Sequence, residues 1–558
     1  MNKVLLNTVN LDDGVIIKKG GGGGGVTINN QEKSVSITEN GDLSVVHDAG
    51  FTGLSKVNVS VDVQPNNQDK VIEIVENGTT EVTADAGFTG LGKVSVNVNV
   101  PTGGGSSSEA DVEFFDYDGT LLYAYSKDEF LSMTEMPPLP TRSGLTCQSW
   151  NYDFDMAQSY VNDNGGLQIG ATYITDNGNT RLYITLPQDG MEIPLNFAQT
   201  DTVVVDWGDG SAQETKTSYW GNVNTSHVYE KKGKYCIVLD TQKGNLTLKS
   251  TANMAQGDLL GSQSLVLTKL EIGNGVSEVS NYVLKGYSNL TLITIPNGIT
   301  RIGEECFSAC KSLKSCVVPK TANSYGGSGF KECMSLESVM LPDAMSSTGG
   351  YFLNQCHALK RVTLPAKLSN INTCFCDNCM GLESVIVAKG TTSMNDNAFQ
   401  TCRSLMSISL PEGLQSIPGN CFYACSALKE IQLPKGVGMR AGAQFYLCES
   451  IVSVKLPEGL TSISSSSFYY CRSLQDISFP SSITNIYCNF TQCKSLKKMD
   501  LSRCTSIPSM TDLSTDAKNT NLKIIVPDVL YEDWIVATNW SALAQYTIKK
   551  SDWDTLYA

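Results

Sequence analysis

The sequence predicts a mainly β, multidomain protein whose C-terminal half is a solenoid of short stacked strands. The first of three observations behind this prediction is a row of nine cysteines at intervals of 23 residues, the last interval being 22: Cys310, Cys333, Cys356, Cys379, Cys402, Cys425, Cys448, Cys471 and Cys493. The second is an apolar–polar alternation after each cysteine, and the third is a β-rich unit that recurs at an offset of 37 residues near the N-terminus. A fixed period of this size is typical of repeat proteins, in which each unit packs on its neighbours.

Each 23-residue repeat predicts one β-strand and one tight turn. An alternating apolar pair such as Val339 and Leu341 indicates a strand with one buried face, and a proline such as Pro342 usually closes it because proline lacks the N–H that a ladder needs. Segments such as Phe422–Cys425 predict single helical turns that bury a ring and a thiol together; in the repeat of Cys379, Cys376 takes the aromatic position. Most repeats carry that aromatic residue three positions before the cysteine: Phe307, Phe330, Phe399, Phe422, Phe445, Phe468 and Phe490.

Residues 251–521, with units such as Cys402-Arg-Ser-Leu-Met-Ser-Ile-Ser-Leu-Pro411, resemble the BspA-like leucine-rich repeats. The resemblance implies a leucine-rich-repeat solenoid and says little about function. Residues 522–558 are expected to form a C-terminal cap. They begin with one last repeat-like strand, Asp528 is placed to N-cap a helix, and Trp534 and Trp540 can cover the open end of the stack.

The 18 cysteines leave three interpretations: disulfides, a metal site or free buried thiols. Equivalent side chains on stacked strands run parallel, whereas a disulfide needs β-carbons about 3.8 Å apart and turned toward each other. Cys374, Cys376 and Cys379 have a zinc-like spacing, but the repeat phase explains them and no fourth ligand with the usual spacing lies nearby. The sequence therefore favours free, buried thiols, with no metal and no cofactor.

Charge and hydropathy narrow the range of partners. The formal net charge is −15 and the sequence pI about 4.8, without a cluster of lysines and arginines, which argues against a nucleic-acid partner. The apolar run in residues 1–13 is too short for a signal peptide, and no stretch approaches the ~20 apolar residues of a membrane span. We therefore expect a soluble chain with no membrane insertion, released by lysis unless a signal has been removed.

Residues 1–100 predict a docking segment followed by two small β modules. The glycine run 20–25 makes residues 1–25 an N-terminal docking segment, a flexible hinge, or both. Residues 26–100 hold two modules, each with an Asn-Gly turn (Asn40-Gly41 and Asn77-Gly78) and a final alternating strand. Modules this small bury little core alone, so we expect them to intertwine in a homotrimer. They resemble the short β-repeats of virion structural proteins of tailed bacteriophages.

Residues 101–110 predict a flexible linker and residues 111–164 a β-rich connector. Within the connector, Phe114–Leu122 resembles the first motif of the haloacid-dehalogenase-like phosphatases, which would make Asp116 the nucleophile and Asp118 the acid/base. That chemistry needs a parallel sheet, which the following residues do not predict. The favoured interpretation is a turn at Asp116–Thr120 between two hairpin strands. The connector also resembles segments of phage tail and fibre proteins.

Residues 165–250 show short alternating strands. Their Trp207–Gly210 turn and His227–Tyr235 stretch resemble the PKD-type immunoglobulin-like domain, which implies an immunoglobulin-like β-sandwich that serves as a spacer or adhesive module. Turn-forming roles are favoured for Asp206 and Asp209, with a cation site as the alternative. His227 is expected in the core.

No catalytic motif is found, since there is no Ser-His-Asp candidate or Walker loop and the three histidines fall in different domains. We therefore expect a protein that is not an enzyme. Recognition is expected at the outward positions of the repeat strands, although an ordinary solvated face is the alternative at each of them. These positions form the candidate binding face: Met340, Thr363, Ile386, Ser409, Gln432, Lys455 and Ser478.

Together these parts favour a bacteriophage virion protein, a tail or head fibre or host-surface adhesin. Its N-terminus would bind other virion proteins, and its C-terminal solenoid would contact a host surface protein or glycan. The alternative is a bacterial BspA-like surface adhesin, located outside the cell or at its surface. A third interpretation is a structural protein on the head or tail of a phage that binds no receptor.

Overall fold

The structure, a computed structural model, describes residues 9–13, 30–37, 53–61, 67–74, 90–98 and 110–557, apart from 218–220, 244–245, 249–258, 441, 489, 515 and 519–520. The chain divides into two compact units, one of residues 1–113 with 121–129 and the other of residues 114–120 with 130–558. None of the helices in the described parts has the length and apolarity that a bilayer crossing requires.

The N-terminal unit contains β-strands with mixed pairing. β1 (Val9–Asp13) is antiparallel to β2 (Asn30–Ile37), β2 is parallel to β3 (Gly53–Val61), and β4 (Asn67–Ile74) is parallel to β5 (Gly90–Val98). Both Asn-Gly turns and the glycine run lie outside the described residues. The two-module organisation and the homotrimer stay predictions.

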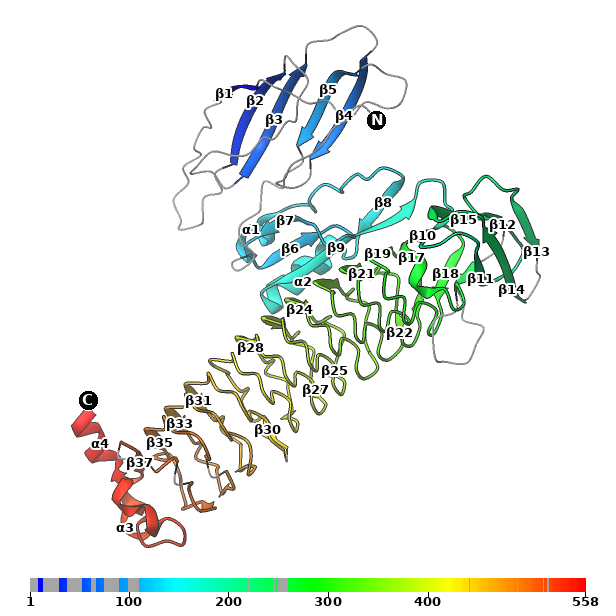
Figure 1. The fold of residues 1–558 in the computed structure, drawn as a ribbon. Coiled ribbons are helices and arrows are strands. Elements are labelled where there is room, and N and C mark those ends of the chain that lie inside the picture. The colour runs from blue at the N-terminus through cyan, green and yellow to red at the C-terminus, as the bar shows by residue number, and fades with distance from the viewer. Residues whose placement is uncertain are drawn as a thin grey trace. The chain divides into compact units, whose positions relative to one another are not determined.

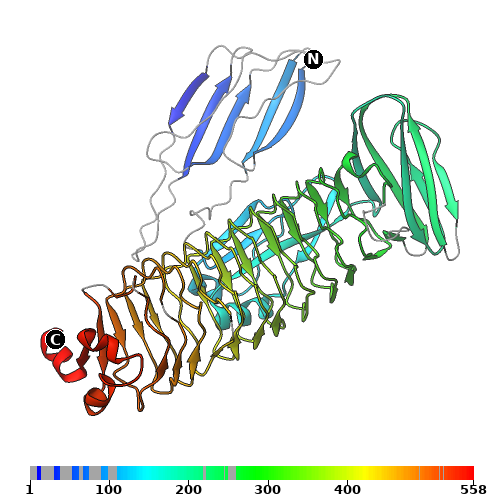
Figure 2. The ribbon, with the colours of Figure 1, turned by 60° about the horizontal axis from the view of Figure 1, so that its bottom comes forward.

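Two sheets of the second unit continue into the solenoid (Figure 2). β10 (Thr180–Leu186) pairs antiparallel with β17 (Leu267–Glu271), and β16 (Leu246–Leu248) pairs in parallel with β18 (Val276–Val279). The first solenoid strands therefore extend both sheets without a break in hydrogen bonding. The other strands of this region are β11 (Met191–Gln199), β12 (Thr202–Asp206), β13 (Glu214–Thr217), β14 (Gly221–Tyr229) and β15 (Gly233–Lys243). The immunoglobulin-like classification stays a prediction.

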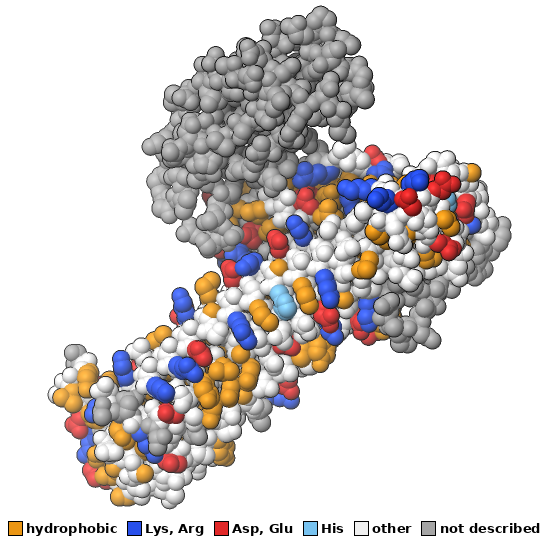
Figure 3. Space-filling model, in the orientation of Figure 1, with side chains coloured by type: hydrophobic (Ala, Val, Ile, Leu, Met, Phe, Trp, Pro, Cys, Tyr) orange, Lys and Arg blue, Asp and Glu red, His pale blue; other side chains and the backbone are white. Residues whose placement is uncertain are grey.

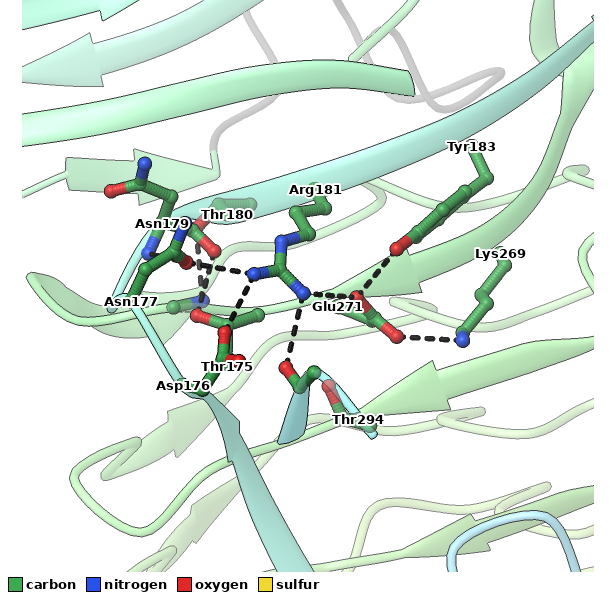
Figure 4. A network of polar contacts seen from close by, with 12 residues as sticks. Thr175, Asp176, Asn177, Asn179, Thr180, Arg181, Tyr183, Lys269, Glu271 and Thr294 are labelled. Carbon is green, nitrogen blue, oxygen red and sulfur yellow. Dashed lines mark hydrogen bonds and ion pairs between the residues drawn. The ribbon is translucent and has the colours of Figure 1, made fainter. Parts of the chain in front are cut away.

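A polar network centred on Glu271 joins β10 to the solenoid (Figure 4). The Glu271 Oε2 atom accepts a hydrogen bond from the Tyr183 hydroxyl at 2.9 Å and lies 3.4 Å from Arg181 Nη1, while Oε1 lies 2.6 Å from Lys269 Nζ. Glu271 is buried. These three partners replace the water that the carboxylate loses on burial. They also hold β10 against β17, the first strand of the solenoid.

Most solenoid repeats contribute two short strands, which build two parallel ladders (Figure 1). The first ladder contains the predicted strands: β19 (Leu292–Thr294), β21 (Ser315–Val317), β23 (Ser338–Met340), β24 (Arg361–Thr363), β26 (Ser384–Ile386), β28 (Ser407–Ser409), β31 (Ser453–Lys455), β33 (Asp476–Ser478) and β35 (Lys498–Asp500). The second contains two-residue strands: β20 (Arg301–Ile302), β22 (Ser324–Tyr325), β25 (Asn370–Ile371), β27 (Ser393–Met394), β29 (Ser416–Ile417), β30 (Gly438–Met439), β32 (Ser462–Ile463), β34 (Asn485–Ile486) and β36 (Ser509–Met510). The second ladder is absent from the sequence prediction because two residues are too few to show alternation.

The ladder cysteines lie in the interior, as predicted, and all 18 cysteines of the chain are free. They also make hydrogen bonds that the sequence did not suggest. The thiol of Cys333 donates to the Phe307 carbonyl at 3.1 Å, and that of Cys448 donates to the Phe422 carbonyl at 3.1 Å. Burial raises the pKa of both thiols, which keeps the proton needed for donation. Each thiol thus ties one repeat to the repeat before it.

Aromatic rings stack along the same interior, as between Phe422 and Phe445, whose centroids lie 5.6 Å apart with an interplanar angle of 4°. Cys376 takes the aromatic position of its repeat, as predicted, and is buried there. Phe375, one residue earlier, supplies a ring that stacks on Phe352 at 5.8 Å. The predicted helical turns are wrong. The residue before the cysteine has a positive φ, as in Ala424 (58°), and this left-handed conformation ends the turn before a helix can form.

The C-terminal segment extends the first ladder and covers its end. β37 (Lys523–Val526) is the predicted last repeat strand, and β38 (Thr547–Lys549) pairs with it in parallel. Trp534 and Trp540 are buried and meet edge to face at 5.1 Å. Asp528 does not cap the helical turns that follow it, contrary to the prediction; its carboxylate instead accepts the N–H of Ser551, in the first turn of the last helix, at 3.0 Å. The helical elements are η2 (Asp528–Leu530), α3 (Tyr531–Trp534), η3 (Ser541–Tyr546) and α4 (Lys550–Tyr557).

The connector precedes the two sheets, and its part in the second unit folds against the solenoid (Figure 1). Its elements are β6 (Val112–Phe115), β7 (Leu121–Tyr125), α1 (Lys127–Ser132), β8 (Leu145–Trp150) and α2 (Phe154–Asn164). β9 (Leu167–Thr175) follows the predicted boundary at residue 164, but it pairs with β8 in the same sheet, so we count it as part of the connector. The predicted turn between β6 and β7 is confirmed by hydrogen bonds from the Asp116 N–H to the Thr120 carbonyl (2.8 Å) and from the Thr120 N–H to Asp118 Oδ1 (3.0 Å).

Candidate binding face

The first ladder presents its third strand residue outward in each repeat, as the sequence predicts. Neighbouring strands are in register, so Ile386 lies beside Ser409, Ser409 beside Gln432, and Lys455 beside Ser478. Successive positions along such a stack are about 4.8 Å apart. The predicted residues therefore form one continuous row on the backbone.

The connector covers the first part of this row, which corrects the predicted binding face. Met340 is 0% exposed and Thr363 is 4% exposed. The Asn151 side-chain amide donates to the carbonyls of Val318 and Met340, at 3.2 Å each, and the Tyr160 hydroxyl donates to the Leu364 carbonyl at 2.5 Å. Met340 and Thr363 are therefore not available to an external partner. The prediction treated the row as exposed along its whole length.

The part of the connector that covers the row, which we call the cover, ends at the C-terminal end of α2. Asn164 Oδ1 accepts the backbone N–H of Lys389 at 2.7 Å, and Asp163 Oδ1 lies 3.1 Å from Lys389 Nζ. Beyond this seam Ile386 and Ser478 are half-buried, while Ser409, Gln432 and Lys455 are exposed. Five of the seven predicted residues thus lie on an open surface.

The open part of the face is hollowed into two adjoining cavities of about 510 and 730 Å³. The smaller one is lined by Asp163 and Asn164 of the connector as well as by solenoid residues. Ser409, Glu412 and Gln432 line both cavities, which makes them one continuous depression. We call it the strand-face groove.

The larger part of the groove carries both signs of charge: Glu412, Glu430, Lys435, Lys455, Glu458 and Arg503. Arg503 pairs with Glu458 at 2.7 Å. Glu430, Lys435 and Lys455 form no ion pair with any other residue that the structure describes. Figure 3 shows the same mixture of acidic and basic side chains along the solenoid. The groove can therefore offer free charges of either sign to a ligand.

The groove walls were not predicted, although the sequence carries a signal for them. Glu412, Lys435 and Glu458 each follow a strand-closing proline and recur at the repeat interval of 23 residues. The predicted binding face contains strand residues alone, and these wall positions lie just beyond the strands.

A ladder of tyrosines was also missed. Tyr423, Tyr446 and Tyr469 stack with centroids 4.8 and 5.3 Å apart and interplanar angles of 5°. Each ring covers the face of the next, so the ladder shows ring edges to its surroundings. A sugar ring that stacks on an aromatic needs an open face, and this geometry withholds it.

The motif that resembles a phosphatase is a structural ion pair. Asp116 is buried, its Oδ1 accepts the Tyr117 N–H at 2.7 Å, and its Oδ2 accepts a hydrogen bond from Arg142 Nε at 2.6 Å. Burial raises the pKa of this carboxyl, and the Arg142 charge opposes that rise. The Asp116 carboxylate is thus paired with Arg142 inside the fold.

Asp206 and Asp209 stabilise their turn, in line with the favoured interpretation. Asp206 Oδ1 accepts the Gly208 N–H at 2.9 Å, and Asp209 Oδ1 accepts the Ser211 N–H at 3.0 Å. His227 stacks on Trp207 at 5.1 Å but is only half-buried, and its Nε2 lies 2.7 Å from Asp209 Oδ2. Slight burial acts to raise the pKa of Asp209, but hydrogen bonds from Ser211 and His227 outweigh it and lower that pKa to about 2.

No group of three or more His, Cys, Asp or Glu side chains with the geometry of a metal site occurs among the residues that the structure describes.

Comparison with known protein families identifies the type of repeat. Residues 277–406 and 392–512 match the BspA type leucine rich repeat region in six copies. These residues are therefore BspA-type leucine-rich repeats in a β-solenoid, as the sequence indicated. No curated protein matches the chain.

Three solved structures illustrate the similarity. A leucine-rich repeat protein from Bacteroides ovatus is 21% identical, with 56% of this chain and 90% of that one covered and a TM-score of 0.39. A leucine rich cell surface protein from Faecalibacterium prausnitzii is 21% identical, with 50% and 89% covered and a TM-score of 0.30. The pneumococcal vaccine antigen PcpA is 16% identical, with 54% and 82% covered and a TM-score of 0.35.

Proposed function

We propose that this protein is a non-enzymatic surface adhesin of the BspA-like type, and that it binds a molecule on another cell in the strand-face groove. The observation that carries the proposal is the groove itself: an open, polar depression on a stack of BspA-type repeats, with charged side chains that have no partner of their own. A binding site needs side chains held in place before the ligand arrives. Here the interior thiols and stacked rings hold the strands that carry them.

The match to BspA-type repeats favours the bacterial surface adhesin over the virion protein, although the sequence analysis preferred the latter. The virion interpretation keeps one specific support, the resemblance of the 37-residue units to phage β-repeats. In either case residues 1–25 would anchor the chain, the modules of residues 26–100 would form a homotrimer, and the solenoid would carry the binding site. Antibody labelling of producing cells and of purified particles separates the two: label on the cell envelope supports the adhesin, and label on particles supports the virion protein.

The binding role is tested with one bulky substitution in the groove and one outside it. Ser409 is exposed and lines both cavities, so Ser409→Trp fills the groove. Gln415 lies in the same repeat, next to β29 on the second ladder, is also exposed and lines neither cavity, which makes Gln415→Trp the matched control. Fluorescently labelled full-length protein is incubated with intact host epithelial cells and with other bacteria.

We expect the wild type and Gln415→Trp to bind equally and Ser409→Trp to lose most of its binding. Equal binding by all three proteins would remove the groove from the proposal. A wild type that binds neither type of cell would remove the adhesin role itself. Circular dichroism melting of the variants checks that each is folded.

A further inference from the structure

The prolines that close the first-ladder strands leave a row of backbone carbonyls without their ladder donors. In the second ladder, the N–H of one residue donates to the carbonyl 24 residues earlier, as from Asn395 to Ile371 at 2.8 Å, whereas most residues at this distance on the first ladder are prolines. By the same register, Pro411 stands opposite the carbonyl of Val387, Pro434 opposite that of Leu410, and Pro457 opposite that of Leu433. Proline has no N–H to give. These three carbonyls accept no hydrogen bond from any residue that the structure describes.

The connector shows how such carbonyls are satisfied. Val318 occupies the position equivalent to Leu410 four repeats earlier, and its carbonyl stands opposite Pro342. Because Pro342 has no N–H, this carbonyl accepts a hydrogen bond from the Asn151 side-chain amide. Under the connector Val318 is 0% exposed, whereas Val387, Leu410 and Leu433 are each 7% exposed. The open carbonyls therefore lack the donor that the covered one has.

The open carbonyls lie in the strand-face groove. Val387 and Leu410 line its smaller cavity, and Leu433 lines the larger one. Three stacked positions make a row about 10 Å long at the usual strand spacing. A carbonyl accepts hydrogen bonds and cannot donate them, so the ligand has to bring several donors in a line.

The other groove residues narrow the ligand further. The larger cavity is lined by three carboxylates and three cations, so it has no net charge. Its serine, lysine and glutamate side chains are types that are depleted in protein–protein interfaces, and the aromatic residues that are enriched there are missing from its lining. A row of acceptors also disfavours sulfate, sialate or uronate groups, which bring further acceptors.

We infer that the strand-face groove binds a neutral, linear oligosaccharide, whose hydroxyls donate to the carbonyls of Val387, Leu410 and Leu433. Every ring of such a chain carries several hydroxyl groups, so one ligand meets several acceptors in sequence. Glu430, Gln432 and Lys455 supply side-chain partners for the remaining hydroxyls. The inference rests on the proposed binding role of the groove and names the class of molecule that it recognises.

The test measures binding of the full-length protein to a panel of linear neutral hexose oligosaccharides, with sulfated and sialylated oligosaccharides as comparison, by array screening and then calorimetry. Pro434→Ala is the informative variant, because its new N–H can take the Leu410 carbonyl away from the ligand. Pro365→Ala is the matched control, since its partner carbonyl belongs to Leu341, which is 2% exposed and lines neither cavity of the groove. Ser409→Trp serves as the blocked groove.

We expect at least one neutral oligosaccharide to bind the wild type and Pro365→Ala equally. Pro434→Ala should bind about two- to tenfold more weakly, the usual effect of one net hydrogen bond, and Ser409→Trp should not bind. Binding to charged glycans alone overturns the inference and leaves the adhesin role intact. The same holds if no glycan binds while binding to cells is still lost in Ser409→Trp; the partner is then a protein. Unchanged affinity of Pro434→Ala also overturns it.

Discussion

The two halves of the first-ladder face share one backbone and differ in what lies over it. In the covered half, Val317 and Met340 project toward the connector, and both are buried. In the open half, Ser409 and Gln432 occupy the equivalent positions and face the groove. The strand register is the same in both halves, with partners 23 residues apart. The repeat therefore determines the scaffold, and the outward side chains of each repeat determine whether the chain covers that scaffold itself.

This difference also explains why the face ends in a groove. The connector supplies donors and apolar contact only as far as Lys389, where α2 ends. Beyond that point the outward residues are polar, so leaving them in water costs little. An external ligand could therefore reach this face only at the repeats that the chain does not cover.

The largest effect is expected where the cover meets the strands, at Gly170 in β9. A β-carbon at Gly170 would lie 2.6 Å from Val317 Cγ2, and β9 and the solenoid are both well packed there. We expect Gly170→Ala to lower the free energy of unfolding by about 1–3 kcal/mol, the usual cost of overpacking. Thermal melting gives the size of the loss, and proteolysis near residues 150–175 shows whether the connector has lifted.

The control lies in the open half. A β-carbon at Gly413 would have its nearest atoms at 3.8 and 3.9 Å, so Gly413→Ala should change stability by no more than about 0.5 kcal/mol. If both substitutions cost the same, the connector is not packed tightly on the face and the contrast between the halves fails.

A second, smaller effect should be equal in the two halves, because the thiols lie inside the scaffold. Cys333 and Cys448 are fully buried, and each donates to a carbonyl at 3.1 Å. We expect Cys333→Ala and Cys448→Ala each to lower the free energy of unfolding by about 1–1.5 kcal/mol, from the lost hydrogen bond and the small cavity left behind. Urea unfolding monitored by circular dichroism measures both.

Ser426→Ala is the reference for this pair, because its hydroxyl makes only an exposed contact at 3.4 Å with the Arg403 carbonyl. It should have almost no effect. A much larger loss for Cys333→Ala than for Cys448→Ala would mean that the cover also supports the interior, and the two halves would then differ in more than their surface.

The sequence predicted the scaffold well because its determinants are periodic. The cysteines, the alternating strand residues and the prolines repeat every 23 residues, and each was placed correctly in the stack. The turn conformation was missed because a positive φ at residues such as Ala424 leaves no mark in residue type. Glycine or asparagine would have signalled it.

The binding face was predicted less well because its cover is not periodic. Asn151 and Tyr160 contact carbonyls 167 to 204 residues away in the chain, and no spacing rule connects them. A trace of the cover exists in the sequence, since Val317 and Met340 are apolar at positions where Ser409 and Gln432 are polar. An apolar residue at an outward repeat position indicates that something covers it. That contrast was available and was not used.

The smallest effect is expected at the seam between the halves. Lys389 pairs with Asp163 at 3.1 Å, and both side chains are more than half exposed, so Lys389→Gln should cost at most about 1 kcal/mol. The backbone N–H of Lys389 still donates to Asn164 in this variant, which keeps the end of α2 in place. We expect slightly faster amide hydrogen exchange in the last turn of α2 and no change in the solenoid.

Lys360→Gln is the matched control, because Lys360 pairs with Glu383 at the same distance of 3.1 Å, with both partners exposed and inside the solenoid. It should leave exchange in α2 unchanged. If Lys389→Gln exposes the whole of α2 to exchange, the surface ion pair rather than the buried contacts of Asn151, Tyr160 and Gly170 would be holding the cover. The apolar outward residues would then no longer explain why the first half of the face is closed.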